Sequence, residues 1–273
     1  MPTTSEKRAA FKRLHESGCF VIPNPWDVGS ALYLQSLGFP ALATTSAGFA
    51  WAVGAADGRV TRAAALAHIA ELSAAVAVPF NADFEGGFAD EPEGVAESVR
   101  LCVETGVSGL SIEDFTGNRD TPLYDLGLAV ARIAAARGAI DAAGGGVLLT
   151  GRSEGFIRGR PDLDETVRRL QAYAQAGADC LYAPGISTRE QISAVVQAVA
   201  PKPVNLLMGT PSALTVADCA GLGVRRISVG GSLARAAWGG FIRAAKLIKE
   251  AGSFNGFADA APGAELNKAF SKK

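Results

Sequence analysis

Histidine and lysine are the residue types whose scarcity most constrains the chemistry of this 273-residue chain. There are two histidines, His15 and His68, and eight lysines, none of which lies between Lys12 and Lys202. Because both histidines fall in stretches with a helical pattern, an acid–base pair or a triad built on histidine is disfavoured. A Schiff-base mechanism needs a lysine at the end of a strand, so the lysine-free interval disfavours that mechanism as well.

Cysteine is also sparse. The four cysteines are far apart and form no CxxC pair, which argues against a disulfide framework and against a zinc site. This usage is typical of reduced thiols in a cytoplasmic protein. The four positions are Cys19, Cys102, Cys180 and Cys219.

Neither charge nor hydrophobicity is concentrated in one part of the chain. The sequence has 26 basic and 27 acidic residues and no basic cluster, which disfavours a nucleic-acid partner. No apolar run approaches the roughly 18 residues that a membrane span needs, and the first residues lack the apolar centre of a signal peptide. Since 48% of the residues are hydrophobic, we expect a globular protein with a large core, and the other two observations favour no membrane and no nucleic-acid partner.

Short apolar runs rich in β-branched residues recur along the chain, and helix-length stretches separate them. This alternation predicts an α/β fold with a parallel sheet, and eight strands are the number that closes a (β/α)8 barrel. The predicted strands are Cys19–Asn24, Ala41–Thr45, Val78–Asp83, Gly109–Glu113, Val147–Arg152, Ala178–Ala183, Pro203–Met208 and Arg225–Val229.

The competing architecture is an open, doubly wound sheet. It would be favoured by a GxGxxG turn after the first strand, but residues 23–27 read Pro-Asn-Pro-Trp-Asp. We therefore predict one TIM-type barrel over residues 1–251, with an N-terminal helix and a C-terminal helix at Leu233–Glu250. Residues 252–273 are predicted to form a loosely attached tail.

Carboxylates gather at the ends of the second, third and fourth predicted strands, where barrels of this kind hold their chemistry. Packed closely, such groups would repel one another, and a divalent cation would relieve the repulsion. Oxygen ligands alone favour Mg²⁺ or Mn²⁺ over zinc. Asp83 is the predicted direct ligand, with Glu85 and Glu113 acting through water. The five carboxylates expected at the mouth are Asp57, Asp83, Glu85, Glu113 and Asp114.

Other polar residues at the strand ends suit a carboxylate or an oxyanion. Arg152 faces the carboxylates from the fifth strand, and its planar guanidinium suits bidentate binding. The turns Ser46-Ala47-Gly48 and Gly230-Gly231-Ser232 are either anion-binding runs of amides or plain turns. Asp27 is either a functional carboxylate or the N-cap of a helix.

Together these motifs resemble the isocitrate lyase and phosphoenolpyruvate mutase superfamily, from about Phe20 to Ala251. The resemblance implies Mg²⁺-dependent chemistry next to the carboxylate of a 2-oxo acid, in a barrel whose eighth helix, here Leu233–Glu250, is swapped between protomers in a dimer of dimers. The motifs that carry the resemblance are Asn24-Pro-Trp-Asp27, Thr45-Ser-Ala-Gly48, Asp57-Gly58, Asp83-x-Glu85 with Gly86-Gly87, Ile112-Glu113-Asp114, and Gly151-Arg-Ser-Glu154.

The resemblance also implies a role for each matching residue. Asp83 would bind the metal directly, while Asp57, Glu85 and Glu113 would hold its water ligands. Arg152 would contact the substrate oxyanion, and the predicted catalytic residues are Arg152, Glu113, Asp57 and Tyr182. The residues expected to bind or enclose the substrate are Trp26, Thr45, Ser46, Ala47, Gly48, Asn118, Arg119, Asn205 and Gly230.

The loop after the fourth strand departs from the family. Residues 113–124 contain neither the cysteine of the family's lyases nor the lysine of its mutases, and Asn118 and Arg119 are the nearest replacements. The chemistry that remains is cleavage of a C–C bond through a metal-bound enolate, by decarboxylation or by a retro-aldol or retro-Claisen step. Water, Tyr182 or Tyr124 would supply the final proton.

Three functions stay open at this point. The favoured one is a lyase acting on a 2-oxo or 2-hydroxy dicarboxylate such as oxaloacetate. The second is a C–P bond mutase or hydrolase of the phosphonopyruvate type. The third is a barrel that binds a 2-oxo acid, such as 2-oxoglutarate or oxaloacetate, with little turnover.

Overall fold

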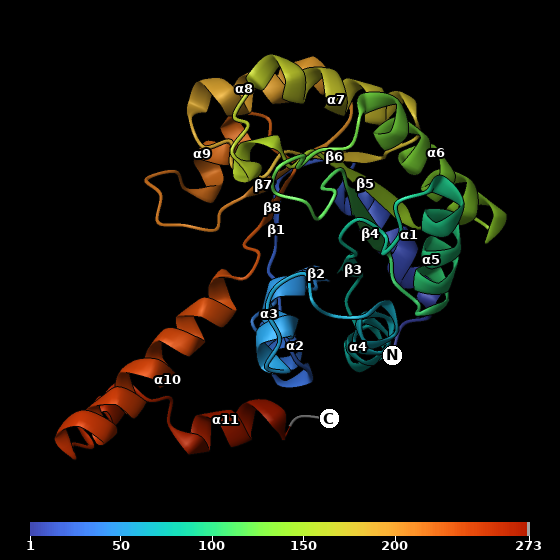
Figure 1. The fold of residues 1–273 in the computed structure, drawn as a ribbon. Coiled ribbons are helices and arrows are strands. Elements are labelled where there is room, and N and C mark those ends of the chain that lie inside the picture. Colours follow the sequence, from blue (N-terminus) through green and yellow to red (C-terminus); the bar gives the residue numbers. More distant parts are fainter. Residues whose placement is uncertain (272–273) are drawn as a thin grey trace.

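A computed structural model describes residues 1–271, in which eight parallel strands form one barrel (Figure 1). The strands are hydrogen-bonded in the order β1-β8-β7-β6-β5-β4-β3-β2. At the remaining seam, the Ala43 amide donates to the Pro23 carbonyl at 3.1 Å and joins β2 to β1. The predicted (β/α)8 barrel is confirmed. Its strands are β1 (Phe20–Ile22), β2 (Leu42–Ala43), β3 (Phe80–Asp83), β4 (Gly109–Glu113), β5 (Leu148–Arg152), β6 (Cys180–Tyr182), β7 (Val204–Leu207) and β8 (Arg226–Ser228).

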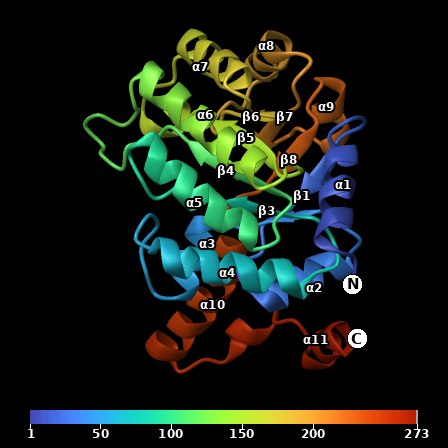
Figure 2. The same ribbon diagram turned by 90° about the vertical axis from the view of Figure 1, so that its right-hand side faces the viewer.

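Helices surround the barrel and alternate with its strands (Figure 2). Glycines end several of them in the left-handed conformation, as the sequence predicted, for example Gly106 at φ 84°, Gly177 at φ 105° and Gly223 at φ 87°. The helices are α1 (Thr4–Leu14), α2 (Val28–Ser36), α3 (Ser46–Ala52), α4 (Arg62–Ala75), α5 (Pro92–Glu104), α6 (Leu126–Ala142), α7 (Leu163–Gln175), α8 (Arg189–Val199), α9 (Val216–Gly221), α10 (Ser232–Ala251) and α11 (Gly263–Phe270), with the 3-10 turns η1 (Gly155–Arg158) and η2 (Asn255–Phe257).

Helix α1 closes the N-terminal end of the barrel. Its Phe11 is fully buried and packs with Phe20, Ile22 and neighbouring apolar residues of β1 and β2. A side chain at Gly109 would lie 2.6 Å from the Phe11 ring, so only glycine fits this close approach. With this end sealed, the open end of the barrel is the one at which the strands finish.

Most predicted elements appear with slightly shorter bounds, and Gly109–Glu113 coincides with β4. Helix α3 was not predicted as a helix. It has seven residues, two of which are aromatic and one of which is glycine, and this is too short for a helical period to show. Its start is fixed locally, because the Thr45 side chain accepts the Gly48 amide as an N-cap.

Helix α10 leaves the barrel instead of packing against β8 and its neighbours (Figures 1 and 2). Ala234 is the one residue of α10 that is buried within this chain, whereas Trp238 and Phe241 are exposed by 38% and 62%. The segment that follows is folded, with η2 packed on α10 and α11 on α2. No helix within residues 1–271 combines the length and the apolar character needed to cross a membrane.

Candidate active site

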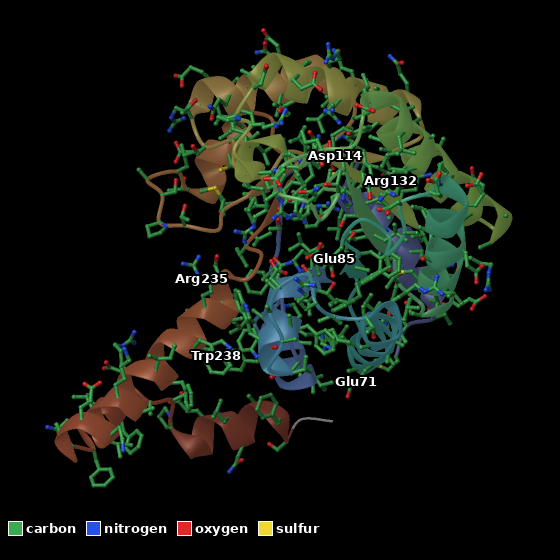
Figure 3. All side chains as sticks on the ribbon, viewed as in Figure 1. Glu71, Glu85, Asp114, Arg132, Arg235 and Trp238 are labelled. Carbon is green, nitrogen blue, oxygen red and sulfur yellow. The ribbon has the colours of Figure 1, made fainter. Side chains whose placement is uncertain are left out.

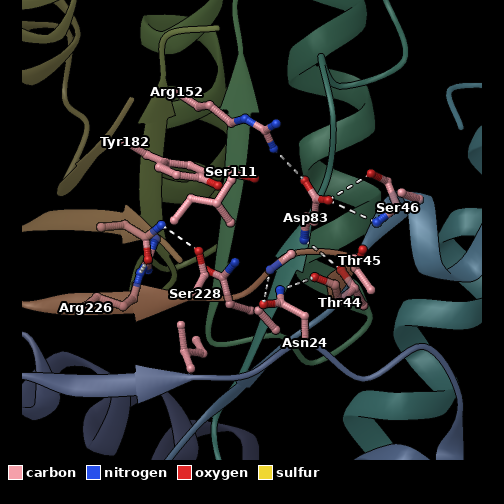
Figure 4. A pocket seen from close by; sticks show the side chains of 18 of the residues that line it. Asn24, Thr44, Thr45, Ser46, Asp83, Ser111, Arg152, Tyr182, Arg226 and Ser228 are labelled. Carbon is pink, nitrogen blue, oxygen red and sulfur yellow. Dashed lines mark hydrogen bonds and ion pairs between the residues drawn. The ribbon is translucent and has the colours of Figure 1, made fainter. Parts of the chain in front are cut away.

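A cavity of about 160 Å³ opens at the end of the barrel where the strands finish (Figure 4). Residues of the β1–β8 barrel and of the segments that follow β2 and β8 line it, so distant parts of the sequence meet there. The lining residues are Ile22, Asn24, Ala43, Thr44, Thr45, Ser46, Ala47, Asp57, Asn81, Asp83, Ser111, Arg152, Tyr182, Asn205, Leu207, Arg226, Ser228, Gly230 and Gly231.

Asp83, the last residue of β3, is held on both carboxylate oxygens. Its Oδ2 accepts the amide of Ser46 at 3.0 Å and the Ser46 hydroxyl at 2.9 Å, and its Oδ1 lies 3.2 Å from Arg152 Nη1. The Asp83 amide donates to Thr44 Oγ1 at 2.7 Å, which ties the end of β3 to the end of β2. The carboxylate predicted to bind a metal therefore lies in the cavity with a fixed orientation.

Arg152 is the centre of an ion-pair network at the end of β5. Besides Asp83, its guanidinium lies 3.3 Å from Glu113 Oε2 and donates to the buried Glu154, while its Cζ is 5.1 Å from the Tyr182 ring centroid. Burial alone would lower the pKa of Arg152, but the carboxylates of Glu154 and Glu113 outweigh it and raise that pKa well above its ordinary value. Arg152 is thus a permanent cation facing the cavity, as predicted.

A second, larger cavity of about 670 Å³ adjoins the first, and Asp57 lines both. The segments after β2, β3 and β4 form its walls. Arg158 of η1 lines the second cavity, where its Nε donates to Glu154 at 2.8 Å and its Cζ lies 3.6 Å from the Phe115 ring centroid. The lining residues are Ala56, Asp57, Gly58, Arg59, Glu85, Gly86, Phe88, Ala89, Asp90, Glu113, Phe115, Thr116, Gly117, Arg119, Tyr124 and Arg158.

The carboxylates around the cavities are difficult to ionise together. Burial, reinforced by the charges of Asp83 and Asp57, raises the pKa of Glu85 to about 7. Burial, and next the charge of Asp83, also raises the pKa of Asp57. For Glu113, burial and the neighbouring Glu154 raise the pKa well above its ordinary value, although Arg152 opposes this. A cluster of this kind gains stability from any cation that enters it.

The backbone that presents Glu85 is strained. Glu85 has φ 48° and Phe88 has φ 56°, both in the left-handed region that non-glycine residues seldom adopt. Each such residue costs about 1–2 kcal/mol, so surrounding contacts must hold the segment 84–90 in place. The Glu85 carbonyl is one anchor, because it accepts the Glu113 amide at 3.0 Å.

Polar residues deeper in the barrel form the floor of the first cavity; the sequence analysis selected Asn205 among them but not Arg226. Arg226 donates to Asn205 Oδ1 at 2.8 Å and to Thr150 Oγ1 at 3.0 Å, and its Nη1 lies 3.3 Å from His15 Nε2. Burial, together with the charge of Arg226, lowers the pKa of His15 to about 3. The signal available in the sequence was the two-residue period of β8, which places Arg226 on the same face as Ser228.

The prediction that Asp114 belongs to the cluster of five carboxylates at the mouth was wrong. It follows Glu113 directly and points to the other side of the barrel wall, away from the mouth; Figure 3 shows it apart from Glu85. There the Asp114 carboxylate accepts the Tyr173 hydroxyl at 2.6 Å and the Glu154 amide at 2.8 Å, and lies 3.3 Å from Arg169. It supports the segment after β5 from behind the site.

The two glycine-containing turns have different environments. Ser46-Ala47-Gly48 is the first turn of α3, with Ser46 and Ala47 in the cavity wall and Gly48 buried behind them. In the other turn, the amides of Val229 and Gly230 both donate to Asn24 Oδ1 at 2.9 Å. Those two amides are already satisfied, so the predicted anion site at Gly230 has no free donor there.

The remaining predicted residues lie at or beyond the rim. Arg119 lines the second cavity, whereas Asn118 is exposed and makes bonds within its own loop. Trp26 does not line the first cavity and packs behind Gly48, where an added side-chain carbon would lie 3.1 Å from it. Of the two interpretations of Asp27, the structure supports the helix cap, because its carboxylate accepts the Ser30 amide at the start of α2.

The donor set fits a hard divalent cation held by few direct ligands. Within residues 1–271, no three histidine, cysteine or carboxylate side chains converge closely enough to enclose an ion by themselves. Mg²⁺ commonly needs one or two carboxylates and keeps the rest of its shell as water. Asp83 as the direct ligand, with Asp57, Glu85 and Glu113 around it, would satisfy that requirement. Burial is the largest cause of the raised pKa values of these three carboxyls, and for Asp57 and Glu85 the charge of Asp83 comes next, which such an ion would compensate.

Known proteins with similar sequences and structures share this barrel fold. A model of the family described as "Phosphoenolpyruvate phosphomutase" matches residues 11–249. An oxaloacetate decarboxylase of Paraburkholderia xenovorans is 31% identical over 238 residues, which are 83% of this chain and 75% of that protein. The chain belongs to the phosphoenolpyruvate phosphomutase family. The predicted superfamily is therefore confirmed, and with it the prediction of an enzyme.

Solved structures extend the comparison to the whole fold. A candidate lyase or mutase from Burkholderia cenocepacia is 49% identical, with a TM-score of 0.95 over 98% of this chain and 97% of that one. A 2,3-dimethylmalate lyase is 29% identical, with a TM-score of 0.84 over 98% of this chain and 95% of that one. The long helix after β8 is included in these alignments, because they cover nearly all of the chain.

Proposed function

We propose that this enzyme is a divalent-cation-dependent lyase that cleaves a C–C bond of a 2-oxo or 2-hydroxy dicarboxylate. Decarboxylation of an oxaloacetate-like acid is the favoured reaction. The observation that carries the proposal is the permanently charged Arg152 facing Asp83 across a cavity of small-molecule size. The names of the relatives, an oxaloacetate decarboxylase and a 2,3-dimethylmalate lyase, support the same bond type.

Mg²⁺ or Mn²⁺, when bound, would supply a positive charge next to the substrate oxygen on which negative charge develops. Asp83 would hold the ion directly, and Asp57, Glu85 and Glu113 would hold its water ligands. The Ser46 amide and hydroxyl, which bond to Asp83, would be the donors nearest to a substrate carboxylate placed beside a cation on Asp83.

Arg152 and Tyr182 provide the groups that this chain adds to the reaction. Arg152 binds and orients the substrate carboxylate or oxyanion through its fork of N–H donors. Burial raises the pKa of Tyr182 to about 12, so its hydroxyl stays protonated at neutral pH. After CO₂ leaves, the carbon that held it takes up one proton, and the Tyr182 hydroxyl lines the cavity in which that carbon would lie.

The missing cysteine and lysine distinguish this reaction from others in the superfamily. Residues 113–124 place Thr116, Arg119 and Tyr124 around the second cavity and provide no thiol or amine there. Decarboxylation requires no acid on the departing group, since CO₂ leaves uncharged. The absence of these groups is therefore compatible with decarboxylation and with few of the family's other steps.

The test is a turnover assay on a panel of acids with Mg²⁺, followed by ¹H NMR of the products and by phosphate release. Pyruvate formed from oxaloacetate above the metal-catalysed background supports the proposal, and Asp83→Asn should lower that rate at least 100-fold. Phosphate released from phosphonopyruvate, or a rearranged product, would establish the C–P alternative. Binding of 2-oxoglutarate or oxaloacetate without turnover of any acid would establish a binding barrel.

We also propose that the enzyme is a homo-oligomer in which α10 packs on a partner, in a dimer of dimers. The support is α10 itself, which leaves its own barrel and exposes apolar side chains to water. A partner packed on α10 would remove these side chains from water. Light scattering should give about four times the 28.0 kDa of one chain. A mass of 28.0 kDa at micromolar concentration would contradict the proposal. The exposed apolar residues are Leu233, Trp238, Phe241, Ile242, Leu247 and Ile248.

A further inference from the structure

We infer that Arg132 is a positioning residue that holds Glu85 at the mouth of the barrel, an inference that rests on the proposed metal-dependent function. Arg132 projects from α6 toward the segment after β3 and is 1% exposed (Figure 3). Its Nη2 donates to the Gly86 carbonyl, and its Nη1 donates to the carbonyls of Ala89 and Asp90. These three acceptors lie on both sides of the strained Phe88 and directly after the strained Glu85.

The charge of Arg132 has no carboxylate partner. No ion pair within residues 1–271 includes it, although arginines elsewhere in the barrel wall are paired with acids. Its buried guanidinium is compensated by the three backbone carbonyls and by the face of Tyr124, whose ring centroid lies 4.1 Å from Cζ. Both Nη atoms are bonded to these carbonyls, whereas the Nε is buried without a hydrogen-bond partner. A buried cation held by backbone carbonyls is tied to one backbone conformation, because any other conformation would leave the charge without acceptors.

Besides Arg132, backbone hydrogen bonds hold the segment 84–90 at its start, from the Gly87 amide to the Phe84 carbonyl and from the Glu113 amide to the Glu85 carbonyl. Residues 84–90 are neither helix nor strand, and two of their non-glycine residues have positive φ. Gly86 lies close beside the guanidinium, since a side-chain carbon there would lie 3.1 Å from Arg132 Nη2. Without Arg132, Glu85 can relax to the right-handed region, which turns its carboxylate away from Asp57 and Asp83.

Tyr124 links the same arginine to the neighbouring loop. The Tyr124 hydroxyl donates to the Asp90 carboxylate, and its amide donates to the Asp114 carbonyl at 3.0 Å. Arg132 therefore lies where the segments after β3 and β4 meet. It reaches neither cavity lining itself, so its effect on the site passes through the position of Glu85.

Mn²⁺ binding, followed by the EPR signal of the free ion, tests the inference without relying on turnover. Arg132→Met should weaken Mn²⁺ binding by about 10–100-fold, the range found when supporting contacts of metal ligands are removed. Arg132→Lys keeps the charge but has one donor group, and it should give an intermediate dissociation constant.

Arg137 provides the matched control. It lies on the same helix, is mostly buried, and pairs with Asp179 at 3.0 Å and Asp141 at 2.8 Å, remote from the mouth. Arg137→Met should lower the melting temperature as Arg132→Met does, yet leave the Mn²⁺ dissociation constant within twofold of wild type. Equal Mn²⁺ affinities of Arg132→Met and wild type would overturn the inference.

A double-mutant cycle with Glu85→Gln separates positioning from general destabilisation. If Arg132 acts through Glu85, Arg132→Met should change the Mn²⁺ dissociation constant less than threefold in the Glu85→Gln background. A full effect in that background would overturn the inference, because Arg132 would then act by another route.

Hydrogen exchange of the metal-free protein tests whether Arg132 holds residues 84–90 in place, independently of whether the enzyme binds a metal. Absence of Mn²⁺ binding to wild type would refute the metal-dependent function, and exchange then decides the role of Arg132. Arg132→Met should speed exchange in residues 84–90 at least 10-fold, including the Gly87 amide that bonds to the Phe84 carbonyl at 2.9 Å. Exchange in this segment equal to that of Arg137→Met would overturn the inference.

Discussion

Acidification should destabilise the protein through His15 at the floor of the barrel. The ring of His15 packs between Phe11 and Phe20, with centroid distances of 4.6 and 5.1 Å, and its Nδ1 bonds to the Phe11 carbonyl at 2.8 Å. Burial and the nearby Arg226 hold its pKa at about 3, against 6.5 for an exposed histidine. Below pH 6.5 the unfolded chain therefore takes up a proton that the folded chain rejects.

The size of this effect follows from the gap between the two pKa values. Stability from neutral His15 is fully present above pH 6.5 and is lost as the pH falls toward 3. Each unit of pH within that window costs about 1.4 kcal/mol, so His15 alone should contribute a loss of about 2 kcal/mol between pH 7.5 and pH 5. That value is large compared with the 5–15 kcal/mol that typically separates folded from unfolded protein.

The assay compares wild type with His15→Asn by urea unfolding at a fixed protein concentration. Asparagine cannot fill the space of the ring, so the variant should be less stable at pH 7.5. At pH 5 the difference between the two proteins should shrink by about 2 kcal/mol, because only wild type carries this titrating group. His68 and Glu85 titrate in both proteins and cancel. A difference in unfolding free energy that stays constant over this pH range would refute the reasoning.

Three further outcomes follow from contacts described above. Tyr173→Phe should lower stability by about 1–3 kcal/mol, since it removes the hydroxyl that donates to buried Asp114, and the KM for substrate should stay unchanged. Gly48→Ala should destabilise by about 1–3 kcal/mol, measured by urea unfolding, because its methyl would lie 2.6 Å from the Thr45 methyl group. In the native protein a thiol reagent should modify Cys19 and spare the other three cysteines, which are buried; rapid reaction of a second thiol would contradict this.

Strand-end residues were predictable from the sequence because parallel strands all finish at one edge of a barrel. This rule alone brought Asp83 and Arg152 together, although 69 residues separate them. It did not say which way each side chain turns, and Asp114 was therefore placed at the mouth although it faces the helices. Applying the two-residue period of a strand to β4 and β8 would have excluded Asp114 and selected Arg226.

Other parts of the site depend on three-dimensional neighbours that no local pattern encodes. Arg132 lies within a helix whose sequence shows nothing unusual, and its three carbonyl acceptors come from a segment more than 40 residues earlier. The hydrogen bond from the Gly230 amide to Asn24 likewise forms only when the first and the last strand of the barrel lie side by side. These contacts emerge from packing, so the structure was required to find them.

The bond between Asn24 and the residues after β8 can form only when nearly the whole barrel has been synthesised. Asn24 emerges early, yet its partner Val229 follows 205 residues later. At about 5–20 residues per second, translation of that interval takes about 10–40 s. Throughout this time the nascent barrel lacks β8 and Arg226, so β1 and β7 have no strand between them and present their edges to other chains. The barrel therefore closes only at the end of synthesis. The yield of folded protein in cells should depend on protecting the growing chain from aggregation as well as on the stability of the finished protein.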